Sequence, residues 1–204
     1  MLNYNKRVLI LCEDSKSSLD YFKSFQKDEK YKRNLSAWNI EIYQPENYSP
    51  LGLVEEAKKK QKRAKQDKNE YDKIWIVLDK DKHANIKDAL NTITQLKNIE
   101  YALSIICFEY WILLHFEKTT KAFETGDKII NYIKSKHFPE YDKGICCYDT
   151  LIDKINTAIT NGEWVVKTAQ YDLDRGTNVA ELGAYTNVHE LVKELIKPKE
   201  KIGL

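Results

Sequence analysis

The chain has 204 residues, of which 42% are hydrophobic and 31% are charged. Gly and Pro are scarce, at 7 and 4 residues, which argues against a disordered or fibrous chain and favours a helix-rich globular α/β protein. The formal net charge is only +2, so a surface for nucleic acid would have to be a local basic patch.

The sequence predicts a cytoplasmic protein without a membrane span. No stretch approaches the roughly 18 apolar residues that a span needs, and the first residues lack the pattern of a secretory signal peptide. The four cysteines form no CxxC pair, so a structural zinc site is not expected. Cys12 and Cys107 lie in apolar, strand-like runs, where buried thiols are expected.

Strands and helices are predicted to alternate over the first half of the chain. Residues 7–12 form a continuous apolar run, which is typical of a strand covered on both faces. The next segment predicts a helix with Ser17 or Ser18 as its cap. The following predicted elements are strands over residues 37–43, 74–78 and 101–106, and helices over residues 51–69, 86–97 and 108–116.

Beyond about residue 118 the pattern changes to helices joined by polar loops, over residues 127–135, 149–160 and 188–196. The alternation in the first half predicts an α/β fold with a three-layer parallel sheet. We therefore expect an α/β core over residues 1–118. Residues 119–204 are expected to form an additional C-terminal helical layer packed on that core, within the same domain.

Acidic residues follow three of the predicted strands. Glu13 comes after the first strand, Asp79 and Asp81 after the third, and Glu109 after the fourth, in the first turn of a helix. Ligands of a parallel sheet bind outside the carboxyl ends of its strands, so these carboxylates would converge if the three strands are neighbours. Their repulsion would be costly unless a divalent cation offset it. Oxygen ligands favour Mg²⁺ or Mn²⁺.

Each acid also has a structural explanation. Asp81 could cap the next helix, and Glu109 could simply favour the positive end of its helix. In the functional interpretation, Asp79 and Asp81 are metal ligands, Glu13 is a ligand or a general base, and Glu109 is a further ligand or an orienting acid.

Four segments, spread in order over nearly the whole chain, resemble motifs of the RloB-like family, which has a Toprim-like fold. LCEDSKSSLDYF resembles its ICEGE-type turn and helix, and IWIVLDKDKH resembles its VWxVFDRDxH segment. CFEYWILLHF closely resembles its CFExWLLLHF segment, and YTNVHELVKEL resembles its C-terminal motif. The resemblance carries over Glu13, Asp79, Asp81, His83 and Glu109 as site residues.

Membership in this family would imply a Toprim-like catalytic core and metal-dependent cleavage of nucleic acid. It would also imply a place in prokaryotic anti-phage defence or abortive infection, with an RloA-like ATPase as partner. A homo-oligomer is left open.

The chain departs from the family pattern at two turns. Asp14 and Ser15 stand where the family has Gly and Glu, so one candidate ligand is lost unless Asp14 replaces it. Ile105 and Ile106 stand where the family often has Asn-Pro, and we expect them to continue the strand. These changes bear on catalytic competence more than on the fold.

Basic residues are interpreted in two ways. Lys16, Lys80, Lys82 and His83 lie near the acids in sequence and could contact a phosphate, or only soften the negative field or start a helix. Residues 58–68 are rich in Lys and Arg and form either a solvated helix face or a nucleic-acid patch. The residues named for that patch are Lys58, Lys59, Lys60, Lys62 and Arg63.

The leading hypothesis is therefore a Mg²⁺-dependent nuclease acting on DNA or RNA, tRNA included. The alternative is a catalytically inactive Toprim-like adaptor or sensor that binds an ATPase partner. Phosphoryl transfer on a small molecule ranks last, because KHANI after the second aspartate does not match the phosphatase pattern. His115, four residues after Trp111, is predicted to be a core histidine bonded to the backbone.

Overall fold

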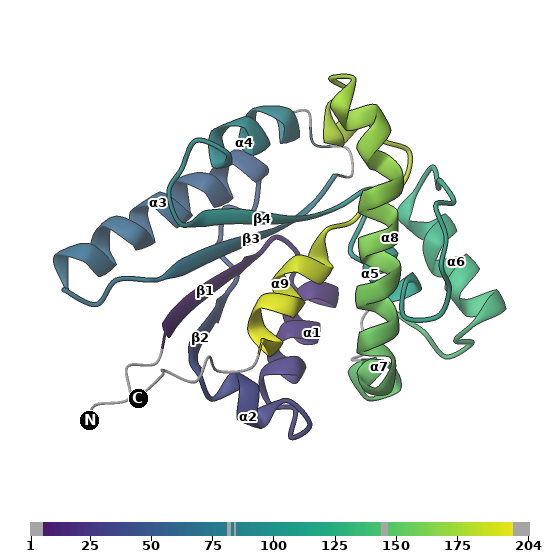
Figure 1. Ribbon diagram of the computed structural model, residues 1–204, viewed down its shortest axis with the longest axis horizontal. Helices are drawn as coiled ribbons and strands as arrows, with labels where there is room; N and C mark the ends of the chain where they lie inside the picture. Colours follow the sequence, from purple (N-terminus) through teal and green to yellow (C-terminus); the bar gives the residue numbers. More distant parts are fainter. Residues whose placement is uncertain (1–5, 81–82, 84, 144–146, 198–204) are drawn as a thin grey trace.

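The computed structural model describes residues 6–80, 83, 85–143 and 147–197, and its centre is a parallel sheet (Figure 1). The strand order is β2-β1-β3-β4, and each neighbouring pair is parallel. The predicted parallel α/β fold is thus confirmed, with the first, third and fourth strands side by side. The strands are β1 (Lys6–Cys12), β2 (Trp38–Tyr43), β3 (Lys73–Asp79) and β4 (Ile99–Ser104).

Helices cover both faces of the sheet, which explains why the strands are apolar without alternation. Leu9 and Ile76 pack with α3 and α4 on one face, whereas Ile10 and Val77 pack with α1, α5 and α9 on the other. Cys12 and Cys107 are buried, as predicted. The helices are α1 (Ser17–Gln26), α2 (Lys32–Leu35), α3 (Pro50–Gln66), α4 (Ile86–Ile93), α5 (Glu109–Leu113), α6 (Gly126–Lys136), α7 (Tyr148–Leu151), α8 (Ile155–Asp174) and α9 (Val188–Ile196).

The fourth strand ends earlier than its apolar sequence predicts. β4 stops at Ser104, and Ile106 has a φ of 70°, in the left-handed region. The expectation that Ile105 and Ile106 continue the strand is therefore wrong. A left-handed conformation costs an L-residue about 1–2 kcal/mol. Packing offsets this cost, because the partly buried Ile106 side chain contacts the apolar clusters on both faces of the sheet.

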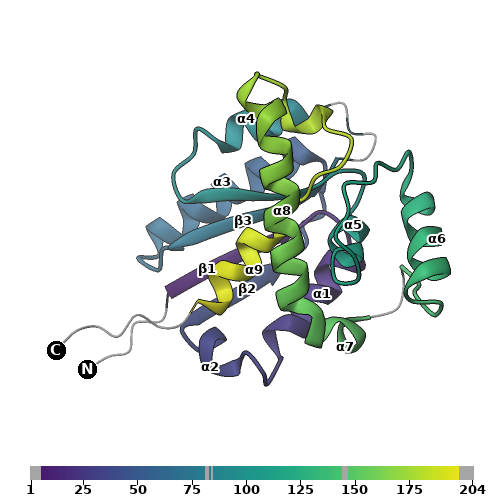
Figure 2. The same cartoon turned by 45° about the vertical axis from the view of Figure 1, so that its right-hand side comes forward.

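The second half of the chain is more helical than predicted. The helix expected over residues 149–160 is divided into the short α7, a 3₁₀ turn over Ile152–Lys154 and the 20-residue α8. Figure 2 shows α8 running in front of the sheet, beside α9 and α5. Of the helices that the structure describes, none is both long enough and apolar enough to cross a membrane.

The segment before α9 covers the outer edge of β4. Ser104 forms an isolated antiparallel bridge with Thr186. The Asn187 side chain acts as a strand substitute: its Oδ1 accepts from Leu103 N at 2.7 Å, and its Nδ2 donates to Tyr101 O at 3.1 Å. Buried backbone groups at this edge therefore have partners, and the segment before α9 is fixed beside the carboxyl end of β4.

Candidate functional site

Glu13 and Asp79 are in contact at the point of the sheet where the strand order reverses. The connection that leaves β1 through α1 and the one that leaves β3 through α4 lie on opposite faces, so the carboxyl ends of these adjacent strands form a topological switch point. Glu13 Oε2 accepts a hydrogen bond from Asp79 N at 2.7 Å. The two residues are only 7% and 8% exposed, so these neighbouring acids lie largely out of solvent.

Glu109 is the most buried acid of the site. It begins α5 and is 0% exposed. Its Oε1 accepts from Ser17 Oγ at 2.6 Å and from Tyr141 OH at 3.1 Å. Its Oε2 lies 3.8 Å from Lys143 Nζ and has no hydrogen-bond partner among the described residues. A fully buried carboxylate is thus held at one oxygen, and the other has only a long ion pair.

The carboxylate of Asp79 is affected both by burial and by the charges of other acids. Burial raises the pKa of Asp79 well above its usual range, and the charges of Asp14, Glu13 and Glu109 raise it further. Lys143 acts in the opposite direction on the pKa of Asp79. Of the four acids predicted to converge, Glu13 and Asp79 are in contact, the charge of Glu109 acts on Asp79, and Asp81 lies outside the described residues.

His83 and Asp14 lie near Glu13 but form different hydrogen bonds. His83 Nε2 lies 2.7 Å from Glu13 Oε1, so the imidazole donates to the carboxylate. Asp14 instead accepts from the backbone N–H groups of Lys16 and Ser18, at 2.9 Å and 3.0 Å, and so closes the turn that begins α1. The prediction that Ser17 or Ser18 caps this helix is wrong. Ser17 is directed at Glu109, and the aspartate before it takes the capping role.

The remaining predicted site residues are less informative. Asp81 and Lys82 lie outside the described residues. Lys80 is half-buried, and its N–H donates to Ser104 O at 2.9 Å. Lys16 is exposed and borders a cavity of about 10 Å³ that Ser17, Tyr141 and Lys143 also line. Within the described part of the chain, no three His, Cys, Asp or Glu side chains are arranged to hold a metal ion together.

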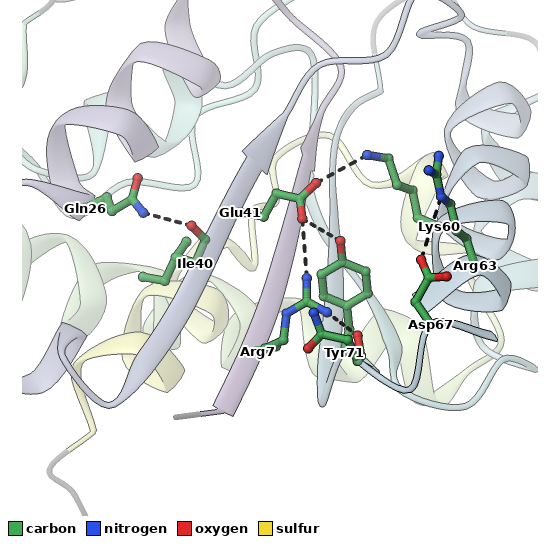
Figure 3. A network of polar contacts seen from close by, with 9 residues as sticks. Arg7, Gln26, Ile40, Glu41, Lys60, Arg63, Asp67 and Tyr71 are labelled. Carbon is green, nitrogen blue, oxygen red and sulfur yellow. Dashed lines mark hydrogen bonds and ion pairs between the residues drawn. The ribbon is translucent and has the colours of Figure 1, made fainter. Parts of the chain in front are cut away.

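The basic segment of α3 lies beside Glu41 of β2 and Arg7 of β1 (Figure 3). Lys60 Nζ is 3.2 Å from Glu41 Oε1, and Arg7 Nη2, at the start of β1, is 3.7 Å from Glu41 Oε2. Tyr71 OH donates to Glu41 Oε2 at 2.5 Å. These contacts fix the last turns of α3 near the amino ends of β1 and β3, whereas the acids lie at the carboxyl ends.

Ion pairs also reduce the positive charge of this segment. Lys58 pairs with Glu55 at 2.8 Å, and Lys59 pairs with Glu56 at 3.7 Å. Arg63 lies 3.8 Å from Asp67 (Figure 3), and Lys62 is exposed. Exposed pairs of this kind contribute little to stability, but they leave less net charge for phosphates. These contacts favour the solvated-face interpretation.

Sequence reasoning missed Tyr141 and Lys143. Both lie between α6 and α7, and Tyr141 is 32 residues beyond Glu109 in sequence. Neither residue belongs to a recognisable motif, so the sequence offers no signal that this loop returns to the acids. The role of Ser17 as a donor to Glu109 was hidden in the same way, because a serine before a helix is typical of a cap.

His115 is a core histidine, as predicted. Its Nδ1 lies 3.0 Å from Trp111 O, and its Nε2 lies 3.3 Å from Tyr21 OH. Burial lowers the pKa of His115 to about 4, so the ring is neutral at pH 7. A neutral ring in which Nδ1 donates and Nε2 accepts satisfies both contacts.

The parallel sheet, its helices on both faces and the acids at its carboxyl edge define a Toprim-like α/β protein. A family model of RloB-like proteins matches residues 8–195. The chain therefore belongs to the RloB-like family. Comparison with curated proteins and with solved structures finds no match.

Proposed function

We propose that the protein is a metal-dependent nuclease of an RloB-like anti-phage or abortive-infection system. It would hydrolyse phosphodiester bonds of DNA or RNA, tRNA included, under the control of an RloA-like ATPase partner. The observation that carries this proposal is the contact of the buried Glu13 with Asp79 at the switch point of the sheet, where the charge of the buried Glu109 also acts on Asp79. Neighbouring buried carboxylates are costly without a cation, and such cost at a ligand-binding edge is typical of a functional site.

The donor chemistry fits a hard divalent cation such as Mg²⁺ or Mn²⁺. The described donors are carboxylates, and the buried Oε2 of Glu109 lacks a hydrogen-bond partner among them. Asp79 and Asp81 would hold the ion, with Glu13 and Glu109 as further ligands or orienting groups. When bound, such an ion lowers the pKa of a water and offsets the negative charge of a phosphodiester.

The protein's own groups would position the reactants. His83 holds Glu13 at Oε1, and the N–H of Asp79 holds it at Oε2, so this carboxylate has a fixed orientation. A carboxylate fixed in this way is suited to accept a proton from water. Ser17 and Tyr141 fix Glu109 in the same manner.

A specific observation favours the second candidate, a catalytically inactive adaptor. Asp14, the acid that could replace the glutamate missing from the turn after Glu13, accepts from two backbone N–H groups at the start of α1. An adaptor would bind the ATPase partner tightly and cleave nothing.

The test is cleavage of single-stranded DNA, double-stranded DNA and tRNA in Mg²⁺ or Mn²⁺, by the chain alone and with its ATPase partner. Asp79→Asn keeps the side-chain volume and removes the charge, and we expect a loss of at least about 100-fold in rate. The matched control is Asp153→Asn, because this side chain is 88% exposed and pairs with Lys30 away from the acids. Activity that survives in Asp79→Ala/Asp81→Ala would refute the site assignment, and no cleavage with the partner present would support the adaptor.

A further inference from the structure

Lys143 brings a positive charge to the acids from the second half of the chain. Its Nζ is 3.8 Å from Glu109 Oε2, and its charge also acts on the carboxylate of Asp79. The Lys143 side chain is 43% exposed, whereas that of Glu109 is 0% exposed. The lysine therefore reaches from solvent to a carboxylate that is fully buried.

The contact between Lys143 and Glu109 is electrostatic and loosely held. At 3.8 Å it is longer than a hydrogen bond. The other oxygen of Glu109 accepts at 2.6 Å and 3.1 Å, so the carboxylate does not depend on the lysine for its position. Because a lysine ammonium is a hydrated point charge on a flexible stem, it can leave this position at small cost.

We propose that Lys143 is a tethered counter-ion of the metal-free site, which a divalent cation displaces when it binds the acids. The inference rests on the proposed function, since it needs a metal site at these carboxylates. An ammonium and a divalent cation repel each other at neighbouring oxygens, and the doubly charged ion interacts more strongly with the same carboxylates. Lys143 would thus keep the acids paired without metal and would lower the apparent affinity for the ion.

The experiment compares Mn²⁺ binding and stability in neutral and charged variants at position 143. Lys143→Met keeps much of the stem and removes the charge, Lys143→Gln is a second neutral variant, and Lys143→Arg keeps the charge. In the neutral variants we expect a lower Tm without metal and Mn²⁺ binding about tenfold tighter by calorimetric titration. The Mn²⁺-induced rise in Tm should also be larger. Lys143→Arg should bind Mn²⁺ like the wild type. Lys136→Met, at an exposed position in the last turn of α6, controls for the loss of one surface charge.

The outcomes separate this inference from the proposed function. If the wild type binds Mn²⁺ and both neutral variants bind it equally or more weakly, the tethered counter-ion is refuted and the metal site stands. If the neutral variants lose affinity for nucleic acid and keep the wild-type Mn²⁺ affinity, Lys143 is a phosphate contact and the inference is again refuted. If no variant and no wild-type protein binds Mn²⁺, both the inference and the metal-dependent function fail.

Discussion

Replacing Gly162 with alanine should destabilise the protein, although alanine is the better helix former. Gly162 is buried inside α8, where α9 packs against it. A Cβ at this position would lie 2.7 Å from His189 Nδ1 and 2.9 Å from His189 Cγ. The His189 ring is itself buried, at 4% exposure. The two helices can approach this closely because residue 162 has no side chain.

Two opposing terms set the magnitude. Gly to Ala inside a helix gains about 1 kcal/mol in helix propensity. Overpacking a buried site costs about 1–3 kcal/mol. This cost should be near the upper end, because the clash is with a ring that cannot rotate away without displacing α9. We expect a net loss of about 1–2 kcal/mol, and about 2–4 °C in Tm for each kcal/mol in a chain of this length.

The assay is urea unfolding of Gly162→Ala in two backgrounds, wild type and His189→Ala. Without the imidazole the contacts at 2.7 Å and 2.9 Å disappear, and only the contact at 3.0 Å with the Cβ of residue 189 remains. The gain in helix propensity of about 1 kcal/mol then offsets most of the remaining cost, so the same substitution should be close to neutral in this background. An equal effect in both, or stabilisation in the wild type, would refute the argument that Gly162 is needed for the approach of α9.

Two further predictions concern buried polar groups. Burial keeps His115 neutral and lowers its pKa to about 4, below the ordinary 6.5, so the unfolded chain binds more protons between these values. Its contribution to stability should be full above pH 6.5 and lost as pH falls towards 4, by roughly 3 kcal/mol at most. Unfolding midpoints in urea from pH 7.5 to 5 should show a shallower fall in His115→Gln. Separately, Ser17→Ala or Tyr141→Phe removes a donor to the buried Glu109 and should each cost about 1–3 kcal/mol in urea unfolding. Tyr48→Phe, at a side chain that is 56% exposed, should cost almost nothing, and an equal cost there would contradict this reasoning.

The strands and their acids could be predicted because both depend on local patterns. A continuous apolar run of strand length indicates a buried parallel strand, and the acid after it must lie at the carboxyl edge. The end of β4 could not be predicted in this way. Ile105 and Ile106 are as apolar as the strand before them, yet β4 ends at Ser104, level with the end of β3, and Ile106 adopts a left-handed φ. That conformation depends on packing from both faces of the sheet.

The length of α8 shows a different limit. The predicted helix ends at Thr160, and Asn161 followed by Gly162 is a typical turn signal. In the structure both residues are needed inside the helix. Asn161 Nδ2 donates to Leu114 O at 2.8 Å and connects α8 to the end of α5, and Gly162 makes room for α9. Tertiary contacts thus override the local preference, and such contacts cannot be read from one sequence.

The candidate site therefore depends on both halves of the chain. Residues 1–118 supply the acids, but Tyr141 and Lys143 supply one of the two hydrogen bonds and the ion pair to Glu109. A buried carboxylate that loses a hydrogen-bond donor such as Tyr141 keeps its full desolvation cost, whereas the loss of the long ion pair with Lys143 costs less. Tyr141 and Lys143 are thus part of the site's electrostatics, although they lie outside the segment that supplies the acids.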